Sequence, residues 1–457
     1  MSGNSGMVSQ HPHQDSTSCP IMCLHEDIIC QLFNYIPQLS DKVHLACVAP
    51  KFRDAFDNWA RRQRSHSLNA QDVEQMQLPD LIVFFEVAGP FITVLMVNTA
   101  SYHKESLIVE FIAEYCKNLE EIHFSNVTDE FRFGQLLSRL THLRRVSIHC
   151  SEVEDVLNLD MENNQELEFF ELINGCYTGK HLCDFPKLQT IVLRDCLLWN
   201  SGELGITLKK LRVLVLEGCC FDVMNQSLYE KIAKCCVDLE DLTFSNCDVH
   251  FEVIAQLVNL KRCTLKTYIS TSNELNLDFL SALAEKRDSK LQYLNLTGQF
   301  EIGNEHATCL GQLNTLLQLH FSDNDVLEDS HFLLFNDLPQ LKLLGLSWCG
   351  SVTDTGLANL ICRCPQLNRM DINHCNQITN NLVFNAISCC GKGTGRSMIL
   401  NVAHTKITNT MLELSKSKVL SAKTRQVELH ESIGLSYWVH PQGSTNYIGF
   451  IEQSQRI

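Results

Sequence analysis

The sequence has few basic residues for its length. Its 457 residues include 37 Lys and Arg against 53 Asp and Glu, which gives a formal net charge of −16. Residues 1–70 hold equal numbers of the two kinds, so the excess acid lies after residue 70. Because an acidic surface repels phosphate backbones, we expect no nucleic acid as the main ligand. Basic or neutral protein segments are better suited as partners.

The sequence also lacks an apolar leader and a long hydrophobic run. Its first twenty residues are polar, without the apolar core of a signal peptide. The most apolar stretch, residues 81–97, is interrupted by Glu86, Gly89 and Pro90 and is short for a membrane span. We therefore expect no membrane association and a cytoplasmic and/or nuclear location.

Motifs of covalent chemistry and cofactor binding are missing as well. The run Gly391–Arg396 resembles a phosphate loop, but Ala386 stands where the first glycine is needed and Gly follows Lys392. The cysteine pairs lack the spacing of a structural zinc site, and no nucleophile elbow is present. We expect no catalytic residues, no metal and no cofactor, and hence a protein that is not an enzyme.

What the sequence does contain is a repeated apolar pattern. The segments LQTIVLRDC (Leu188–Cys196), LRVLVLEGC (Leu211–Cys219) and LKLLGLSWC (Leu341–Cys349) share Leu-x-x-Φ-x-Φ-x-x-Cys, where Φ is apolar. The pattern returns about every 21 to 31 residues, a period typical of a leucine-rich-repeat solenoid. Each unit of such an array is a strand plus a helix that buries its apolar face against its neighbours. The predicted fold class is therefore α/β, a right-handed horseshoe-shaped solenoid.

The repeats extend over most of the chain. We expect about fourteen units, well above the minimum for a stable array. They begin near residues 91, 119, 143, 167, 188, 211, 239, 260, 291, 316, 341, 367, 397 and 424.

The cysteines follow the repeats. Five of them occupy the last position of the pattern: Cys196, Cys219, Cys247, Cys349 and Cys375. There a thiol can meet backbone groups in the turn after the strand, as a small buried side chain with a weak donor. We therefore expect reduced structural thiols, which suits an intracellular compartment.

The segment before the repeats has helical spacing. Ile28, Leu32 and Ile36 follow one another at four-residue intervals, and Pro37 and Pro50 separate three short helices. The first helix has two apolar faces. Because three such helices are too few to bury a large core, one face is expected to contact a partner.

This segment resembles the F-box. It reads Leu24-His25-Glu26-Asp27-Ile28-Ile29, then Leu32-Phe33-Asn34-Tyr35-Ile36-Pro37, then Asp41, Leu45, Val48 and Lys51-Phe52-Arg53. It departs from the family pattern at His25, where the family has Pro, and at Phe52, where it has Trp. The resemblance implies docking on a Skp-family adaptor. The residues implied to contact it are Leu24, Ile28, Leu32, Phe33, Ile36, Pro37, Leu45 and Phe52.

The predicted organisation has five parts. These are a disordered N-terminus (1–19), an F-box-like helical domain (20–65), a linker or N-terminal cap (66–90), the repeat solenoid (91–431) and a C-terminal cap or tail (432–457). Cysteine-containing repeats after an F-box resemble the F-box/leucine-rich-repeat family.

A second interaction site is expected on the strands of the repeats. Residues that flank the two apolar positions of each strand point away from the helices. At these flanking positions, acidic residues such as Glu171 and several arginines are expected to be exposed. The candidates for substrate binding are Phe169, Val192, Arg194, Val213, Val215, Tyr293 and Trp348, because exposed apolar and aromatic side chains mark partner sites.

The resemblance implies a substrate receptor of an SCF-type ubiquitin ligase, which joins a substrate protein to a Skp-family adaptor and through it to cullin and RING subunits. The alternative, motivated by His25 and Phe52, is a leucine-rich-repeat scaffold or inhibitor without ligase association.

Overall fold

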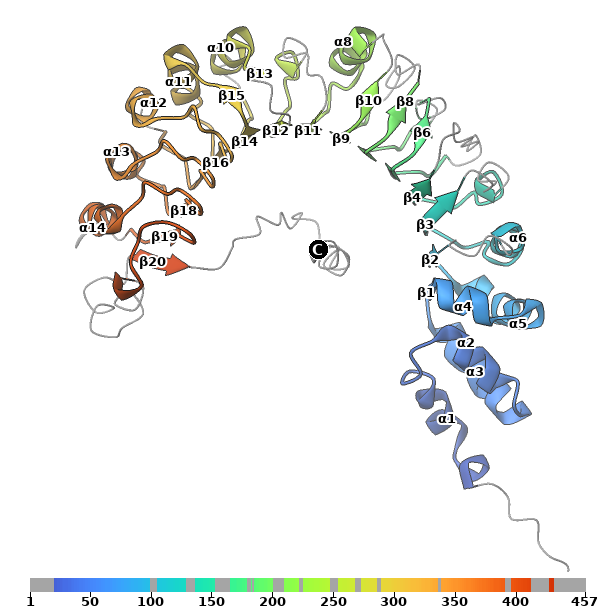
Figure 1. Ribbon diagram of the computed structural model, residues 1–457. Coiled ribbons are helices and arrows are strands. Elements are labelled where there is room, and N and C mark those ends of the chain that lie inside the picture. Colours follow the sequence, from blue (N-terminus) through green and yellow to red (C-terminus); the bar gives the residue numbers. More distant parts are fainter. Residues whose placement is uncertain are drawn as a thin grey trace, which may run out of the picture. The chain divides into compact units, whose positions relative to one another are not determined.

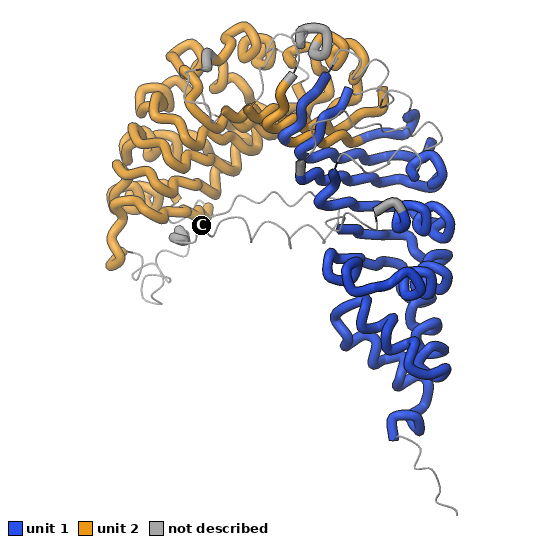
Figure 2. The backbone as a smooth tube through the Cα atoms, turned by 45° about the vertical axis from the view of Figure 1, so that its right-hand side comes forward, with its two compact units in different colours: residues 1–189, 195–199 blue, residues 190–194, 200–457 orange. Residues whose placement is uncertain are grey.

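The computed structural model of the chain is shown in Figure 1. It describes residues 20–98, 105–128, 136–152, 165–178, 182, 185–199, 209–221, 225–246, 254–267, 273–285, 289–335, 338–390, 396–411 and 427–430. The predicted disordered N-terminus (1–19) and C-terminal tail (432–457) lie outside these residues. The chain forms two compact units, residues 1–189 with 195–199 and residues 190–194 with 200–457 (Figure 2).

The first unit begins with short helices. They are η1 (Pro20–Cys23), α1 (Glu26–Leu32), α2 (Leu39–Ala46) and α3 (Pro50–Arg62). Their core is aromatic: the Phe33 ring centroid lies 5.6 Å from that of Phe56 and 6.0 Å from that of Trp59. The Trp59 indole Nε1 donates to Asn34 Oδ1 at 2.9 Å, so its polar atom is satisfied inside this cluster. Pro50 stands in the first turn of α3, where a missing N–H costs nothing.

The repeats start earlier than the sequence predicted. Strand β1 (Ser65–Leu68) pairs parallel with β2 (Val94–Asn98), and α4 (Ala70–Gln75) and α5 (Leu78–Ala88) connect them. The predicted linker 66–90 is therefore an additional strand with two helices, and the F-box-like domain ends before residue 65. The short strand Ser-His-Ser-Leu lacks the leucine pattern, and only its packing against β2 defines it. His66 is buried in this strand, and burial lowers its pKa to about 4.

The remaining strands of the first unit continue the same parallel sheet. Its order is β1-β2-β3-β4-β5. The added elements are α6 (Glu105–Tyr115), β3 (Glu121–Thr128), β4 (Arg145–Glu152) and β5 (Phe169–Ile173), with the short outer strands β6 (Cys176–Tyr177) and β8 (Leu197–Leu198).

The second unit repeats the strand and helix alternation. Its main sheet has the parallel order β7-β9-β11-β12-β14-β16-β17-β18-β19-β20. Within it the strands line the inner side of the curve, and α10 to α14 cover the outer side (Figure 1). These strands are β7 (Thr190–Arg194), β9 (Val213–Glu217), β11 (Asp241–Ser245), β12 (Arg262–Thr267), β14 (Tyr293–Gly298), β16 (Gln318–His320), β17 (Leu343–Gly345), β18 (Arg369–Asp371), β19 (Met398–Asn401) and β20 (Val427–His430). The other elements are β10 (Cys220–Phe221), α8 (Asn225–Cys235), β13 (Asn273–Glu274), α10 (Leu277–Glu285), β15 (Phe300–Glu301), α11 (Asn304–Gly311), α12 (Asp329–Leu334), α13 (Asp354–Arg363) and α14 (Asn380–Cys389).

A strand begins within three residues of every predicted unit start, so the predicted leucine-rich-repeat solenoid is confirmed. Helix α13 shows why the sequence folds this way. Thr353 caps its N-terminus by accepting from the Thr355 N–H, and Leu357, Leu360 and Ile361 are buried on its inner side.

Side chains at the helix starts tie successive repeats together. The Thr353 N–H donates to Asp329 Oδ1 at 2.9 Å, and the Thr379 N–H donates to Asp354 Oδ1 at 2.9 Å. Each capping threonine is thus held by the first-turn carboxylate of the preceding helix. These bonds satisfy partly buried backbone N–H groups at the helix starts and link neighbouring units.

The ladder cysteines bind backbone as expected. The thiols of Cys196, Cys219, Cys349 and Cys375 donate to carbonyls of the preceding repeat, those of Leu172, Leu193, Phe321 and Leu346, at 3.0 to 3.4 Å. All four are buried. Cys247 lies outside the described residues.

We predict that these buried thiols resist alkylation in the folded protein. Burial raises the pKa of Cys375 to about 11, so the reactive thiolate is almost absent at pH 8 and forms only as the pH approaches that value. Iodoacetamide at pH 8, followed by peptide mass spectrometry, should leave Cys375 unmodified and label the exposed Cys47 and Cys220. Labelling of Cys375 as fast as Cys47 would contradict its assignment as a ladder thiol.

One pair departs from the expectation of reduced thiols. Cys362 on α13 and Cys389 on α14 are joined by a disulfide, with their Cα atoms 5.5 Å apart. Both were expected to be reduced structural thiols. Cys362 instead lies on the exposed side of α13, while Cys364 and Cys390 are the buried members.

Candidate functional site

The N-terminal helices carry large apolar side chains in solvent. The exposed fraction is 47% for Ile28, 83% for Tyr35 and 70% for Val48. Ile28 and Leu32 stand four residues apart on α1 and therefore share a face. The predicted contact residues Leu24, Leu32, Ile36 and Leu45 are half-buried, and Pro37 is exposed. A group this apolar on so small a helical domain favours a docking surface.

Two predicted adaptor contacts are corrected by the structure. Phe33 and Phe52 are buried among the helices rather than presented on their surface. Both lie on helix sides that face the other helices, and the domain has few other large side chains to fill its core. The sequence pattern identified the helix but could not assign its two apolar faces, because neighbouring helices decide which one is covered.

The histidine that departs from the family pattern has a local role. His25 is the N-cap of α1, and its Nδ1 accepts from the Asp27 N–H at 3.4 Å. The side chain therefore performs the capping that satisfies a free backbone donor at a helix start. Sequence reasoning omitted the exposed Ile21, Tyr35 and Val48 from the site, although Tyr35 and Val48 stood within the F-box resemblance.

On the strands of the first unit, an acid, an arginine and an aromatic ring lie in register. Glu121, Arg145 and Phe169 are aligned partners on β3, β4 and β5. Arg145 Nε lies 3.6 Å from Glu121 Oε2, and its guanidinium lies 4.2 Å from the Phe169 ring centroid. Phe169 is half-buried under this cation, so it is less accessible than the sequence predicted.

The second unit repeats the arrangement. Asp241, Arg262 and Tyr293 are aligned on β11, β12 and β14. Arg262 Nε lies 2.9 Å from Asp241 Oδ2, and its guanidinium lies 4.3 Å from the Tyr293 ring centroid. His320 packs on the same tyrosine with ring centroids 5.3 Å apart. Tyr293 is consequently buried, which corrects its prediction as an exposed substrate contact.

The valines of the predicted substrate site lie on β7 and β9. Val192 and Val215 are aligned partners, and Val213 is aligned with Thr190. Val213 and Val215 are half-buried, while Val192 is buried and is thus corrected as a contact residue. Arg194 pairs with Glu217, Nε to Oε2 at 3.1 Å, so its charge is partly neutralised within the sheet.

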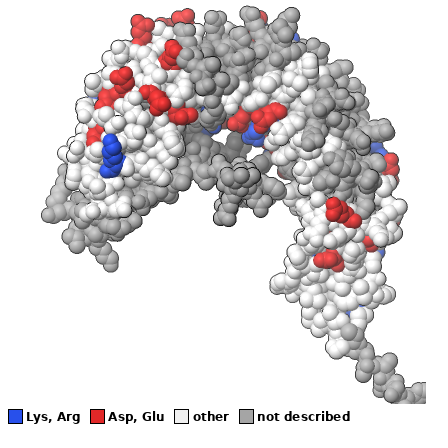
Figure 3. Space-filling model, in the orientation of Figure 1, with Lys and Arg blue, Asp and Glu red and all other residues white. Residues whose placement is uncertain are grey.

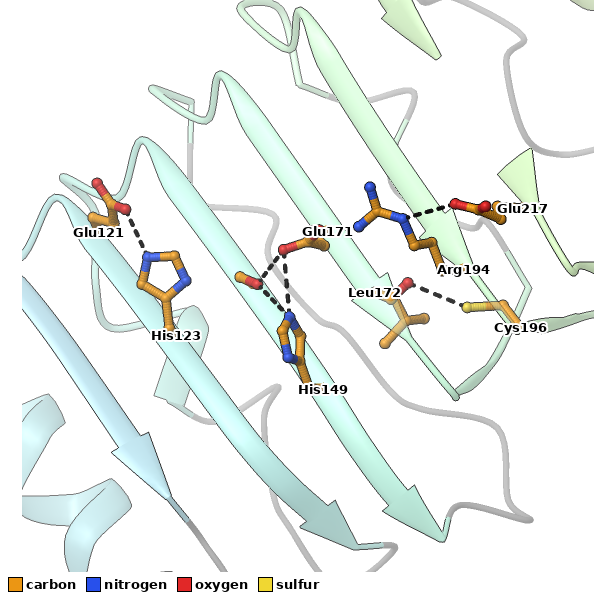
Figure 4. A network of polar contacts seen from close by, with 9 residues as sticks. Glu121, His123, His149, Glu171, Leu172, Arg194, Cys196 and Glu217 are labelled. Atoms are coloured by element: carbon orange, nitrogen blue, oxygen red, sulfur yellow. Dashed lines mark hydrogen bonds and ion pairs between the residues drawn. The ribbon is translucent and has the colours of Figure 1, made fainter. Parts of the chain in front are cut away.

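A buried carboxylate lies on the strand face of the first unit (Figure 4). Glu171, predicted to be exposed, is buried, and its Oε2 accepts from Ser147 Oγ at 2.6 Å. His149 Nε2 lies 3.2 Å from Ser147 Oγ and 3.4 Å from Glu171 Oε2. Ser147 and Glu171 both contact Nε2 of His149. In a catalytic triad, the serine and the carboxylate contact different nitrogens of the histidine ring. The network therefore satisfies a buried carboxyl group and does not assemble a nucleophile.

A second histidine and glutamate pair appears in Figure 4 on β3. His123 Nε2 lies 2.6 Å from Glu121 Oε1. This hydrogen bond, together with the charges of His123 and Arg145, holds the pKa of Glu121 below its ordinary value despite burial. Glu121 is therefore charged at neutral pH and available to its arginine partner.

Trp348 is the most accessible of the predicted substrate contacts. Its exposed fraction is 57%, and it follows β17 in a turn with φ of +64°. Its ring stacks on that of His374 with a centroid distance of 3.7 Å and an interplanar angle of 7°. His374 in turn stacks on His404 at 4.2 Å.

The surface charge of the repeats is mainly acidic. Figure 3 shows acidic side chains over the second unit with few basic ones among them. The described residues contain no group of three His, Cys, Asp or Glu side chains placed to hold a metal ion. Among the helices that the structure describes, none has the length and apolarity needed to cross a membrane.

Comparison with known proteins agrees with the predicted family resemblance. F-box/LRR-repeat protein 4 of Bos taurus is 28% identical over 166 residues, covering 35% of this chain and 22% of the relative. The match therefore spans less than a quarter of the relative's length. No protein-family model matches the chain.

Similar solved structures are leucine-rich-repeat proteins. One from Leptospira interrogans has 17% identity and a TM-score of 0.49, and covers 82% of this chain and 97% of its own. An internalin of Listeria monocytogenes has 17% identity and a TM-score of 0.45, and covers 78% of this chain and 89% of its own. The resemblance to F-box/leucine-rich-repeat proteins predicted from the sequence is confirmed by the curated relative, together with the repeats that the structure shows.

Proposed function

We propose that this chain, which resembles F-box/leucine-rich-repeat proteins, is the substrate-recognition subunit of an SCF-type ubiquitin ligase. The observation that carries the proposal is the exposed apolar surface of the N-terminal helices, with Ile28, Tyr35 and Val48 largely in solvent. Three large apolar side chains in solvent on so small a helical domain support a partner-binding role. That partner is a Skp-family adaptor, through which cullin and RING subunits join.

In this role the chain contributes proximity rather than chemistry. The adaptor surface and the repeat strands are separate parts of one chain, so a bound substrate is held near the ubiquitin thioester carried by the ligase. Holding two reactants together raises their effective concentration and accelerates transfer without a catalytic side chain. The proposed location is cytoplasmic and/or nuclear.

Copurification with the adaptor tests the proposal. The full chain is coexpressed with a tagged Skp-family adaptor, beside a variant carrying Ile28→Asp and Val48→Asp. We expect stoichiometric adaptor on the wild type and at least about a hundredfold weaker binding in the variant, since each charge must be desolvated in an apolar interface. Val258→Asp is the matched control, because Val258 is an apolar side chain of the second unit with an exposed fraction of 59%, between those of Ile28 and Val48.

Each other outcome has a definite meaning. A wild-type chain that binds no adaptor contradicts the proposal and leaves the alternative, a leucine-rich-repeat scaffold or inhibitor. A double variant that keeps the adaptor places the docking surface elsewhere. Circular dichroism of all three proteins confirms that folding is intact.

A further inference from the structure

Three bulky side chains occupy a backbone conformation that L-residues rarely adopt. In the described turns that follow several strands of the second unit, one residue has positive φ. At Gly218, Asn246 and Asp323 this residue is glycine, asparagine or aspartate, whereas after β17, β18 and β19 it is Trp348, His374 and His404. Such placement is uncommon and unfavourable for a residue as bulky as tryptophan, and strained positions concentrate at functional sites.

Asp323, Trp348, His374 and His404 form what we call the turn ladder. The Asp323 N–H donates to Ser347 O at 2.8 Å, the Trp348 N–H to Asn373 O at 2.9 Å, and the His374 N–H to Ala403 O at 2.8 Å. These bonds place the ladder residues of successive repeats next to one another. The three rings then stack, and His374 covers one face of the Trp348 indole.

The other side of Trp348 is open and lies toward an acid. With 57% of the side chain exposed and one face covered by His374, the opposite face is in solvent. The ladder residue of the repeat on that side is Asp323. Among the described residues, neither Asp323 nor the nearby Asp325 takes part in an ion pair. Burial and the charge of Asp325 raise the pKa of Asp323, so a cation beside it would relieve an unfavourable charge.

The chain itself contains two sites where a cation lies between a carboxylate and an aromatic ring. Arg145 lies between Glu121 and the Phe169 ring, and Arg262 lies between Asp241 and the Tyr293 ring. In both cases one guanidinium pairs with a carboxylate and covers an aromatic face. In the turn ladder, acid and ring are on neighbouring repeats, and no described Lys or Arg of the chain makes an ion pair with that acid.

We propose that the turn ladder binds an arginine side chain of a basic segment in a partner protein. The planar guanidinium stacks on the open face of Trp348 and pairs with Asp323, a combination that arginine supports better than lysine. The net charge of −16 favours the approach of such a segment. That the partner is a ligase substrate rests on the proposed function; the affinity for arginine does not.

Peptide binding to the full chain tests this inference. The probe is a fluorescent Gly/Ser peptide with spaced arginines, and its control is the same peptide with neutral citrulline at those positions. Binding is measured by fluorescence anisotropy. A salt concentration near the physiological one screens weak electrostatic attraction between the peptide and the acidic surface. We expect the arginine peptide to bind about tenfold more tightly than the citrulline peptide.

Variants locate the binding. Trp348→Asn removes the ring but keeps a residue suited to positive φ, and should weaken arginine-peptide binding about three- to tenfold. Trp348→Phe should weaken it less, and Asp323→Asn should weaken it too. Trp199→Ala, which removes an exposed tryptophan of the first unit, should change nothing.

Equal binding by Trp348→Asn and wild type, equal binding of the two peptides, or no binding up to millimolar peptide would overturn the inference. Adaptor copurification of the Trp348→Asn protein separates the two proposals. A wild-type chain that binds the arginine peptide but no adaptor defeats the ligase role alone. A wild-type chain that binds adaptor but not the arginine peptide defeats this inference alone.

Discussion

Phe33→Ala is expected to abolish adaptor binding by unfolding the N-terminal helices rather than by removing a contact. Phe33 is fully buried, and its ring packs on Phe56 and Trp59. Truncating a buried phenylalanine costs about 3–5 kcal/mol, through lost apolar burial and the cavity that remains. That loss is comparable to the whole stability of a small helical domain.

Hydrogen exchange and adaptor copurification on the same sample distinguish the two explanations. In Phe33→Ala, amides of α1 to α3 should lose protection while the repeats of the second unit keep theirs, since neighbouring repeats stabilise one another. Phe384→Ala, at an exposed phenylalanine of α14, is the control and should change stability by less than about 0.5 kcal/mol. A protein with Phe33→Ala that stays protected yet loses adaptor would restore Phe33 as a direct contact.

Gly298→Ala is expected to be the most disruptive single substitution in the strands of the second unit. Gly298 ends β14 with φ of +117°, and a Cβ added there would lie 1.9 Å from the Thr267 carbonyl oxygen. The neighbour is backbone of β12 and cannot rotate away. We expect at least about 3 kcal/mol of destabilisation from strain and displacement of the paired strand.

Denaturant unfolding followed by hydrogen exchange measures this effect. Protection should fall first in β12 and β14, because contacts in a repeat array are between neighbours. Gly303→Ala is the matched control: its added Cβ would meet only His306 Nδ1 at 3.6 Å, and the change should cost about 1 kcal/mol or less. Indistinguishable unfolding midpoints for the two variants would show that the β12 and β14 backbones separate easily.

The fold was largely predictable because the spacing of apolar residues within each repeat is enough to predict its strand. The spacing of Leu341, Leu344 and Leu346 marks a strand whose apolar side faces the helices, and all three are buried. The same pattern placed Cys349 and Cys375 against backbone carbonyls. Strand β1 was missed because Ser65–Leu68 lacks this spacing and is defined by pairing with β2.

The candidate sites were less predictable, because accessibility depends on residues of other repeats. Phe169 and Tyr293 lie on the outward side of their strands as expected. Each is covered by an arginine that belongs to the preceding strand, Arg145 and Arg262 respectively. The side of the strand on which each ring lies follows from the two-residue period of the strand. The arginine that covers each ring is set by the register between neighbouring strands.

By itself, then, the sequence determined the phase of the fourteen predicted repeats, the apolar positions that they bury, and the structural role of the ladder cysteines. These properties depend on periodicity within one unit. Only the tertiary structure decided that Phe33 and Phe52 are core, that Ile28 and Val48 are surface, and that Trp348 stacks on His374 beside Asp323. The physical reason is that these arrangements join residues a full repeat or a whole helix apart, whose contacts are fixed by packing and register rather than by local pattern.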